Sequence, residues 1–184
     1  GFRRVDLPKG IRQIGLNEGQ SWSNPTKFVT DALVLEEKMI SEGDMLELHR
    51  QYHFWYIGKS YYDAHECHTF PLGHSHKREY ARRAIWYFAE WIKHVYKEKA
   101  PGFDESAYNA LIFSAESRRF LDEWEEAIVT YKQAEVFATI RNDHLIGLAQ
   151  CYERLKRYDE MLQVTERLID PSRTNPFPHS ASFI

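Results

Sequence analysis

Cysteine is scarce in this sequence: of 184 residues, only Cys67 and Cys151 carry a thiol. Two cysteines cannot build the disulfide framework of a small secreted domain, so an intracellular, reducing location is favoured. Long apolar runs are also missing. The most apolar stretch, "AIWYFAEWI", is too short to cross a bilayer and contains Glu90. The N-terminal "GFRRVDLPKG" lacks the apolar segment of a signal peptide. We therefore expect a cytoplasmic protein with no membrane span.

A strong charge of one sign is absent as well. The formal net charge is only -3, which gives no reason to expect nucleic acid or an acidic membrane as a partner. The motifs G-x-x-x-x-G-K-[ST], G-x-G-x-x-G and H-E-x-x-H do not occur. The D-x-D motif of metal-dependent nucleotide-sugar transferases is missing too. With no catalytic constellation identifiable, we expect no turnover by this chain alone.

Aromatic residues, in contrast, make up 15% of the chain, and these large side chains need burial or a partner. From about residue 25 the apolar positions recur at helical spacing almost everywhere. The pattern predicts helices over residues 25–42, 45–64, 77–97, 104–120, 122–138, 142–156 and 158–169. Residues 1–24 are predicted to form an irregular lead-in with one possible short strand, and residues 171–184 an extended tail. The domain would then span residues 25–170.

Very short turns, "FLDEW" and "LKRYDE", join the last four predicted helices in pairs, so each pair must pack as an antiparallel hairpin. Residues 54–61, "FWYIGKSY", match the first half of the tetratricopeptide pattern. Ala115 and Ala149 are 34 positions apart, which is the period of that repeat. The predicted fold is all-α: a right-handed stack of about three tetratricopeptide-like hairpins, preceded by one helix.

A His-rich stretch, "HECHTFPLGHSH" at residues 65–76, would be an insertion between the two helices of the first hairpin. Zinc favours four ligands from Cys and His, and five candidates are present: His65, Cys67, His68, His74 and His76. No second Cys is nearby, and Pro71 and Gly73 are turn formers. We therefore favour a polar loop that requires no cofactor. A bound zinc ion is the alternative, and a catalytic Cys67–His pair is a third possibility.

A binding face is predicted on the first helix of each hairpin, beside the residues that face the core. Its candidates are Tyr52, Trp55, Lys59 and Tyr62, then Asn109, Ile112, Glu116 and Arg119, then Asp143, Ile146, Gln150 and Glu153. Aromatic residues mixed with polar ones suit recognition of a peptide or stacking on a sugar ring. In the competing interpretation, the helix at 25–42 covers Trp55 and Tyr62.

Two segments, "SWSNPTKFVTDALVLEEKM" and "YHFWYIGKSYYDAHE", resemble the region that follows the catalytic domain in a group of family-2 (GT-A type) glycosyltransferases. The later "LIGLAQCYERLKRYDEML" is similar to the last hairpin of those proteins, and "NPFP" to their tail. The resemblance covers about residues 20–178, and the family's nucleotide-sugar and metal ligands have no counterparts in it.

That resemblance implies a non-catalytic accessory module, either a fragment of a glycosyltransferase or its companion. The partner would be a protein or peptide, including a glycosyltransferase catalytic domain, or a glycan. The alternatives are a glycosyltransferase-related enzyme and a metal-binding protein that uses the His-rich stretch.

Overall fold

A computed structural model describes residues 26–41, 47–67, 74–98, 105–138 and 141–170. These residues form seven helices and no strand, which confirms an all-α fold for this part of the chain. The helices are α2 (Lys27–Ser41), α3 (Glu47–Glu66), α4 (His74–Glu98), α5 (Glu105–Phe120), α6 (Trp124–Glu135), α7 (Asp143–Arg154) and α8 (Tyr158–Ile169). None of them is long and apolar enough to cross a membrane. The lead-in at 1–24 and the tail at 171–184 lie outside the described residues.

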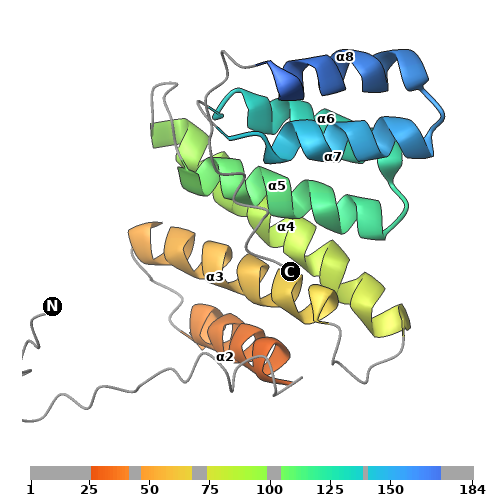
Figure 1. The fold of residues 1–184 in the computed structure, drawn as a ribbon. Helices are drawn as coiled ribbons and strands as arrows, with labels where there is room; N and C mark the ends of the chain where they lie inside the picture. The colour runs from red at the N-terminus through yellow and green to blue at the C-terminus, as the bar shows by residue number, and fades with distance from the viewer. Residues whose placement is uncertain (1–25, 42–46, 68–73, 99–104, 139–140, 171–184) are drawn as a thin grey trace, which may run out of the picture.

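The helices are stacked in chain order, from α2 at one end to α8 at the other (Figure 1). Each helix packs against the next one along the chain, and the pairs α3–α4, α5–α6 and α7–α8 are in close contact. In addition, α5 contacts both α3 and α7, although another helix separates each pair in the sequence. The first helices of the three pairs therefore lie side by side.

Two tight turns connect the helices of the last two pairs, α5–α6 and α7–α8. Asp122 (φ 65°) lies between α5 and α6, and Lys156 (φ 58°) lies between α7 and α8. In each turn the N–H of the next residue donates to the carbonyl oxygen five positions earlier, at 2.9 Å in the first and 2.8 Å in the second. This bond and the positive φ are typical of a helix C-terminus that reverses the chain. The two turns have the same geometry and are 34 positions apart.

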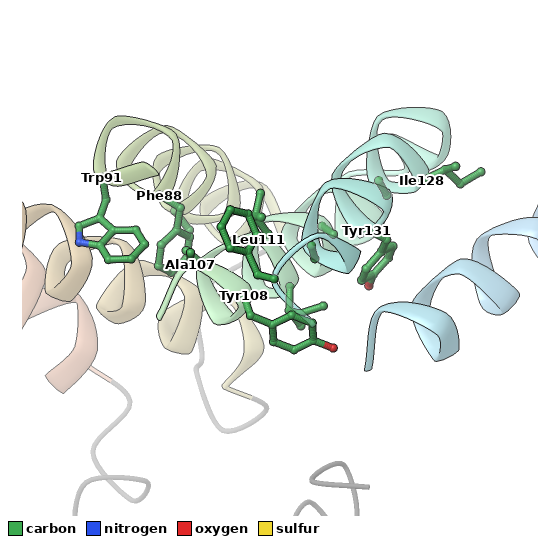
Figure 2. Close-up of a cluster of buried hydrophobic side chains, with 14 of the residues drawn as sticks. Phe88, Trp91, Ala107, Tyr108, Leu111, Ile128 and Tyr131 are labelled. Atoms are coloured by element: carbon green, nitrogen blue, oxygen red, sulfur yellow. The ribbon is translucent and has the colours of Figure 1, made fainter. Parts of the chain in front are cut away.

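A continuous hydrophobic core runs along the stack. Figure 2 shows Phe88, Leu111 and Tyr131, contributed by three successive helices. The sides of α3 to α7 that face neighbouring helices are buried, including Phe54, Ile57, Gly58, Tyr61, Ala84, Phe88, Trp91, Leu111, Ser114, Ala115, Ala127, Tyr131, Ala134, Leu145, Leu148 and Tyr152. Burial is less complete in α8, where Met161 and Leu168 are only partly buried and Thr165 is exposed.

Helix α7 lies directly against the Tyr131 ring of α6 at Gly147. A Cβ at this position would lie 2.2 Å from Cζ of Tyr131. The repeat pattern pointed instead to Ala149 as the small residue of this helix, and Ala149 is only partly buried. Periodicity predicts the side of a helix that faces the core, whereas the point of closest approach depends on the neighbouring ring.

The carboxylate of Glu36 attaches helix α2 to the neighbouring helices α3 and α4. Glu36 Oε1 accepts hydrogen bonds from Tyr61 Oη (2.9 Å) and Tyr87 Oη (2.8 Å). Arg83 Nη1 donates to Tyr61 Oη (2.8 Å) and lies 3.5 Å from Glu36 Oε1. Phe28 packs with Ala64 and Cys67 in a second, smaller apolar cluster. The anchor points of α2 are therefore on α3 and α4.

Candidate functional site

The side-by-side arrangement of α3, α5 and α7 brings together residues more than 50 positions apart. Tyr62 Oη on α3 donates a hydrogen bond to Glu116 Oε2 on α5 at 2.6 Å. Both residues were candidates for the predicted binding face, and the structure joins them directly. We define the binding face as the α3, α5 and α7 residues Tyr52, Lys59, Tyr62, Asn109, Glu116, Arg119, Gln150 and Glu153.

Glu116 is the most perturbed carboxyl group of this face. Burial is the main reason that its pKa rises from 4.5 to about 7, and the negative charge of Glu66 adds to the rise. The hydrogen bond from Tyr62 and the positive charge of Arg119 act in the opposite direction without cancelling it. Burial, with Glu116 beside it, also raises the pKa of Tyr62, so the phenol remains protonated. At neutral pH the Glu116 carboxyl therefore lies close to its titration midpoint.

Arg119 and Lys59 supply the positive charge of the binding face. Arg119 Nη1 lies 3.4 Å from Tyr131 Oη, to which it donates. Lys59 Nζ forms an ion pair with Asp63 Oδ1 at 2.6 Å. The Lys59 ammonium also lies 5.3 Å from the ring centroid of Phe113, within the range of a cation–π contact. Both cations are thus held in position by neighbouring residues.

Asn109 and Asp143 have a structural role, because both accept hydrogen bonds from Arg141. Arg141 donates from Nη1 to Asn109 Oδ1 (2.7 Å) and from Nε to Asp143 Oδ2 (2.9 Å). Its guanidinium stacks 4.6 Å from the ring centroid of Tyr108. Burial alone would raise the pKa of Asp143, but the hydrogen bond and charge of Arg141 outweigh it and the pKa is lowered. This Arg141 clamp fastens the start of α7 to α5.

The Arg141 clamp was not expected from the sequence. Arg141 directly precedes Asn142, the residue before the first turn of α7, and no periodic pattern singles it out. Tyr108, on which the Arg141 guanidinium stacks, is buried together with His144, and Tyr108 Oη lies 3.2 Å from Nδ1 of the His144 imidazole. The partners of a polar residue just outside a helix can be identified only when the position of the neighbouring helix is known.

The aromatic residues of α3 differ in accessibility. Tyr52 is exposed and packs on the ring of Tyr56, with centroids 4.2 Å apart. Trp55 is partly buried and meets rings of α4 and α5, with centroid distances of 5.6 Å to Phe88 and 5.1 Å to Trp91. Of the aromatic candidates, Tyr52 is therefore the one that a partner can reach most easily.

The remaining candidates divide in the same way. Gln150 and Glu153 on α7 are exposed. Ile112 is only 4% exposed, so its side chain belongs to the core. Ile146 is partly buried. The accessible part of the binding face is therefore mainly polar, with Tyr52 at its α3 end.

Both ends of the His-rich stretch are helical, so the loop is shorter than the loop predicted for residues 65–76. α3 continues to Glu66 and α4 begins at His74. His65 is buried, and its Nε2 lies 2.9 Å from Ser117 Oγ. Burial is the main reason that the pKa of His65 falls to about 3, and the nearby charge of Lys77 lowers it further. The imidazole is therefore neutral at physiological pH and acts as a buried hydrogen-bonding group between α3 and α5.

Of the other proposed zinc ligands, the structure describes the side chains of Cys67 and His76, which differ in burial. Cys67 is buried and His76 is exposed. His68 and the side chain of His74 lie outside the described residues. Within the described part of the chain, no three His, Cys, Asp or Glu residues are grouped so that they could hold a metal ion. The zinc site remains an untested alternative.

A groove of about 420 Å³ lies between α6, α7 and α8. Ion pairs between α6 and α8 line or border it: Arg167 with Glu135, and Arg157 Nη1 with Glu125 Oε2 at 3.1 Å. Arg157 also donates from Nε to Glu160 Oε1 at 2.7 Å. Since the arginines of the groove already form these ion pairs, we interpret the groove as a contact that holds the helices together and not as a ligand site.

Comparison with known proteins identifies no relative: no protein-family model, no curated protein and no solved structure matches the chain. The resemblance to the accessory region of glycosyltransferases therefore remains a hypothesis from the sequence. Any function must be argued from the arrangement of α3, α5 and α7 and from the chemistry of the residues that they present.

Proposed function

We propose that this chain is a non-catalytic binding module built on a tetratricopeptide-like repeat. The observation that carries the proposal is the repetition of one turn, with a positive φ at Asp122 and again at Lys156, 34 positions later. The bonds that close the two turns are repeated with the same spacing. A 34-residue period of helix, turn and helix is the defining feature of that repeat class.

The partner would bind on the α3–α5–α7 binding face. Repeat proteins of this kind use the extended surface formed by equivalent helices of successive repeats. Here that surface offers the exposed ring of Tyr52, a cation at Lys59 and exposed polar side chains at Gln150 and Glu153. Both signs of charge together with an aromatic ring suit an extended peptide segment that carries both charges.

The resemblance to glycosyltransferases suggests that this peptide segment belongs to a glycosyltransferase catalytic domain. In that case the reading frame, or a neighbouring one, encodes an α/β domain with a D-x-D motif. An open reading frame with no such domain in either position would remove the glycosyltransferase assignment and leave the peptide-binding proposal unchanged.

The peptide-binding proposal can be tested by selecting random peptides on the immobilised chain and measuring the affinity of enriched peptides by fluorescence anisotropy. Tyr52→Ala removes the accessible ring, and we expect at least about tenfold weaker binding, as for truncation of an aromatic anchor. The matched control is Val129→Ala on α6, which is similarly exposed and not part of the binding face. Selection that enriches no peptide, or equal loss of affinity in both variants, contradicts the proposal.

A second candidate function follows from Glu116. A carboxyl group with a pKa of about 7 on a partly buried face is a feature of general acid–base catalysis. The distinguishing assay incubates the purified chain with nucleotide sugars and a divalent metal. Turnover that disappears in Glu116→Gln would favour the enzyme and overturn the non-catalytic proposal.

A further inference from the structure

Helix α8, the last helix of the described chain, exposes an apolar stripe. Tyr158, Leu162, Thr165 and Ile169 are spaced at i, i+4, i+7 and i+11, so they share one side of the helix. Tyr158 and Leu162 are each 58% exposed and Ile169 is 75% exposed. We call these four residues the terminal stripe. The outer face of a terminal repeat is usually polar, because nothing follows to cover it.

The equivalent side of α6 shows what such a stripe is suited to bind. Positions 34 residues before Tyr158, Leu162 and Thr165 are Trp124, Ile128 and Tyr131, and α7 lies against this side. The counterpart of Ile169 is Glu135, which forms an ion pair with Arg167 of α8. Ile128 and Tyr131 are only 4% and 1% exposed, and Gly147 of α7 allows the close approach to the Tyr131 ring. The side of α6 that a following helix covers thus corresponds to the side of α8 that is open.

The chemistry of a helix that would cover this side of α8 can be derived from the comparison with α6. On α6, the guanidinium of Arg154 from α7 lies 5.6 Å from the ring centroid of Trp124, so a cation of the covering helix stacks on the aromatic residue. On α8, Tyr158 occupies the equivalent position. The two exposed charged side chains of α8, Asp159 and Glu166, are both acidic. They lie on one edge of the terminal stripe, at i+1 and i+4 from Tyr158 and Leu162.

We infer that the terminal stripe is a second binding site, which accepts an amphipathic, basic helix of a partner protein in the way that α6 accepts α7. Apolar residues of that helix would cover Leu162 and Ile169. Its Lys or Arg side chains would stack on Tyr158 and pair with Asp159 and Glu166. This site lies at the α8 end of the stack and is separate from the α3–α5–α7 binding face. It rests on the same 34-residue repeat as the proposed function, but not on partner binding at that face.

Charge argues against a second copy of the chain as the occupant. In a two-fold dimer the same surface meets itself, and when the two α8 helices pack antiparallel the acidic edge of one meets the acidic edge of the other. Like charges placed opposite one another disfavour such an interface. A basic helix turns the same two carboxylates, Asp159 and Glu166, into favourable partners.

A pair of synthetic peptides tests this inference with the full chain. Both are amphipathic helices of about 18 residues, or about five turns, with Leu on one side. One carries Lys at all other positions and the second carries Glu. Binding is measured by fluorescence anisotropy at about 0.05 M salt, where surface charges are weakly screened, and at about 0.3 M salt, where they are strongly screened. The basic peptide should bind with micromolar affinity at the lower salt concentration and more weakly at the higher one. The acidic peptide should bind at least about tenfold more weakly.

Variants locate the bound peptide on the chain. Leu162→Ser should weaken binding of the basic peptide by about tenfold or more, since it removes an exposed apolar contact without disturbing the core. The double variant Asp159→Asn, Glu166→Gln should reduce the salt dependence. The control Val129→Ser, equally exposed on α6, should bind as the wild type does.

Three results would overturn the inference. The first is equal affinity for the basic and acidic peptides. The second is equal binding by wild type and Leu162→Ser, which would show that the basic peptide adheres elsewhere. The third is a sedimentation mass of two chains that falls to one in Leu162→Ser, which would make a second copy the occupant.

Discussion

Two titratable groups, the buried His65 and the partly buried Glu116, should give the stability of this protein an unusual dependence on pH. The folded-state pKa of His65 is lowered from 6.5 to about 3, so its contribution is fully present above pH 6.5 and is lost as the pH falls toward 3. The folded-state pKa of Glu116 is raised from 4.5 to about 7, so its folded protonated form is favoured at low pH and stability decreases as the pH rises from 4.5 to 7. Each group changes the free energy of unfolding by about 1.4 kcal/mol per pH unit within its window.

Between pH 4.5 and 6.5 the two contributions have opposite signs and cancel. Glu116→Gln keeps an oxygen that can accept the Tyr62 hydrogen bond but removes the titration. The free energy of unfolding of this variant, relative to wild type, should therefore increase by about 3 kcal/mol from pH 4.5 to 6.5. His65→Asn should show the opposite trend relative to wild type over the same interval.

The measurement is urea-induced unfolding followed by circular dichroism at several pH values between 4.5 and 6.5. Glu153→Gln, an exposed change on the same binding face, is the matched control and should follow the wild-type profile. If the Glu116→Gln profile ran parallel to wild type across this interval, Glu116 would have an ordinary pKa and the reasoning from its burial would be wrong.

Three further predictions concern the contact of Gly147 with Tyr131, the two turns with positive φ, and the hypothesis of a zinc site in the His-rich stretch. Gly147→Ala should destabilise the fold by about 1–3 kcal/mol in urea unfolding, because its Cβ would overlap the Tyr131 ring; unchanged stability would contradict the close approach. Lys156→Gly should stabilise the fold by about 1 kcal/mol, because glycine adopts positive φ without strain, and Asp122→Gly should gain less because Asp tolerates this conformation better. We expect EDTA to leave the melting temperature unchanged in protein purified without a His tag; near-stoichiometric zinc, lost together with stability in Cys67→Ser, would favour the metal site instead.

The helices were predictable because their signals are local. Apolar residues recur at helical spacing, and the short segments around Asp122 and Lys156 interrupt that spacing where the structure has its turns. The expected core positions, such as Ile57 and Tyr61, are buried because they lie on the apolar side of an amphipathic helix. Each of these conclusions needs only a few neighbouring residues.

The predicted binding face could be anticipated only in part. The sequence assigned Tyr62 and Glu116 to the same predicted face, but it could not show that Tyr62 donates a hydrogen bond to Glu116. Ile112 was expected on this face and is buried, because the width of the covered sector depends on how closely neighbouring helices pack. His65 was expected in a loop, yet it lies in α3 and is bonded to Ser117.

By itself, the sequence determined the all-helical class, the approximate limits of the helices and the 34-residue spacing, because periodicity and turn chemistry act within one or two helical turns. Which polar residues are in contact, and how their pKa values change, depends on how the helices pack against one another. The neutral His65, the raised pKa of Glu116 and the Arg141 clamp all depend on groups from another helix, at distances that no spacing along one helix encodes. The exposure of the stripe on α8 also depends on helix packing: Tyr158 and Leu162 correspond to Trp124 and Ile128 on the covered side of α6, and no helix follows α8 among the described residues.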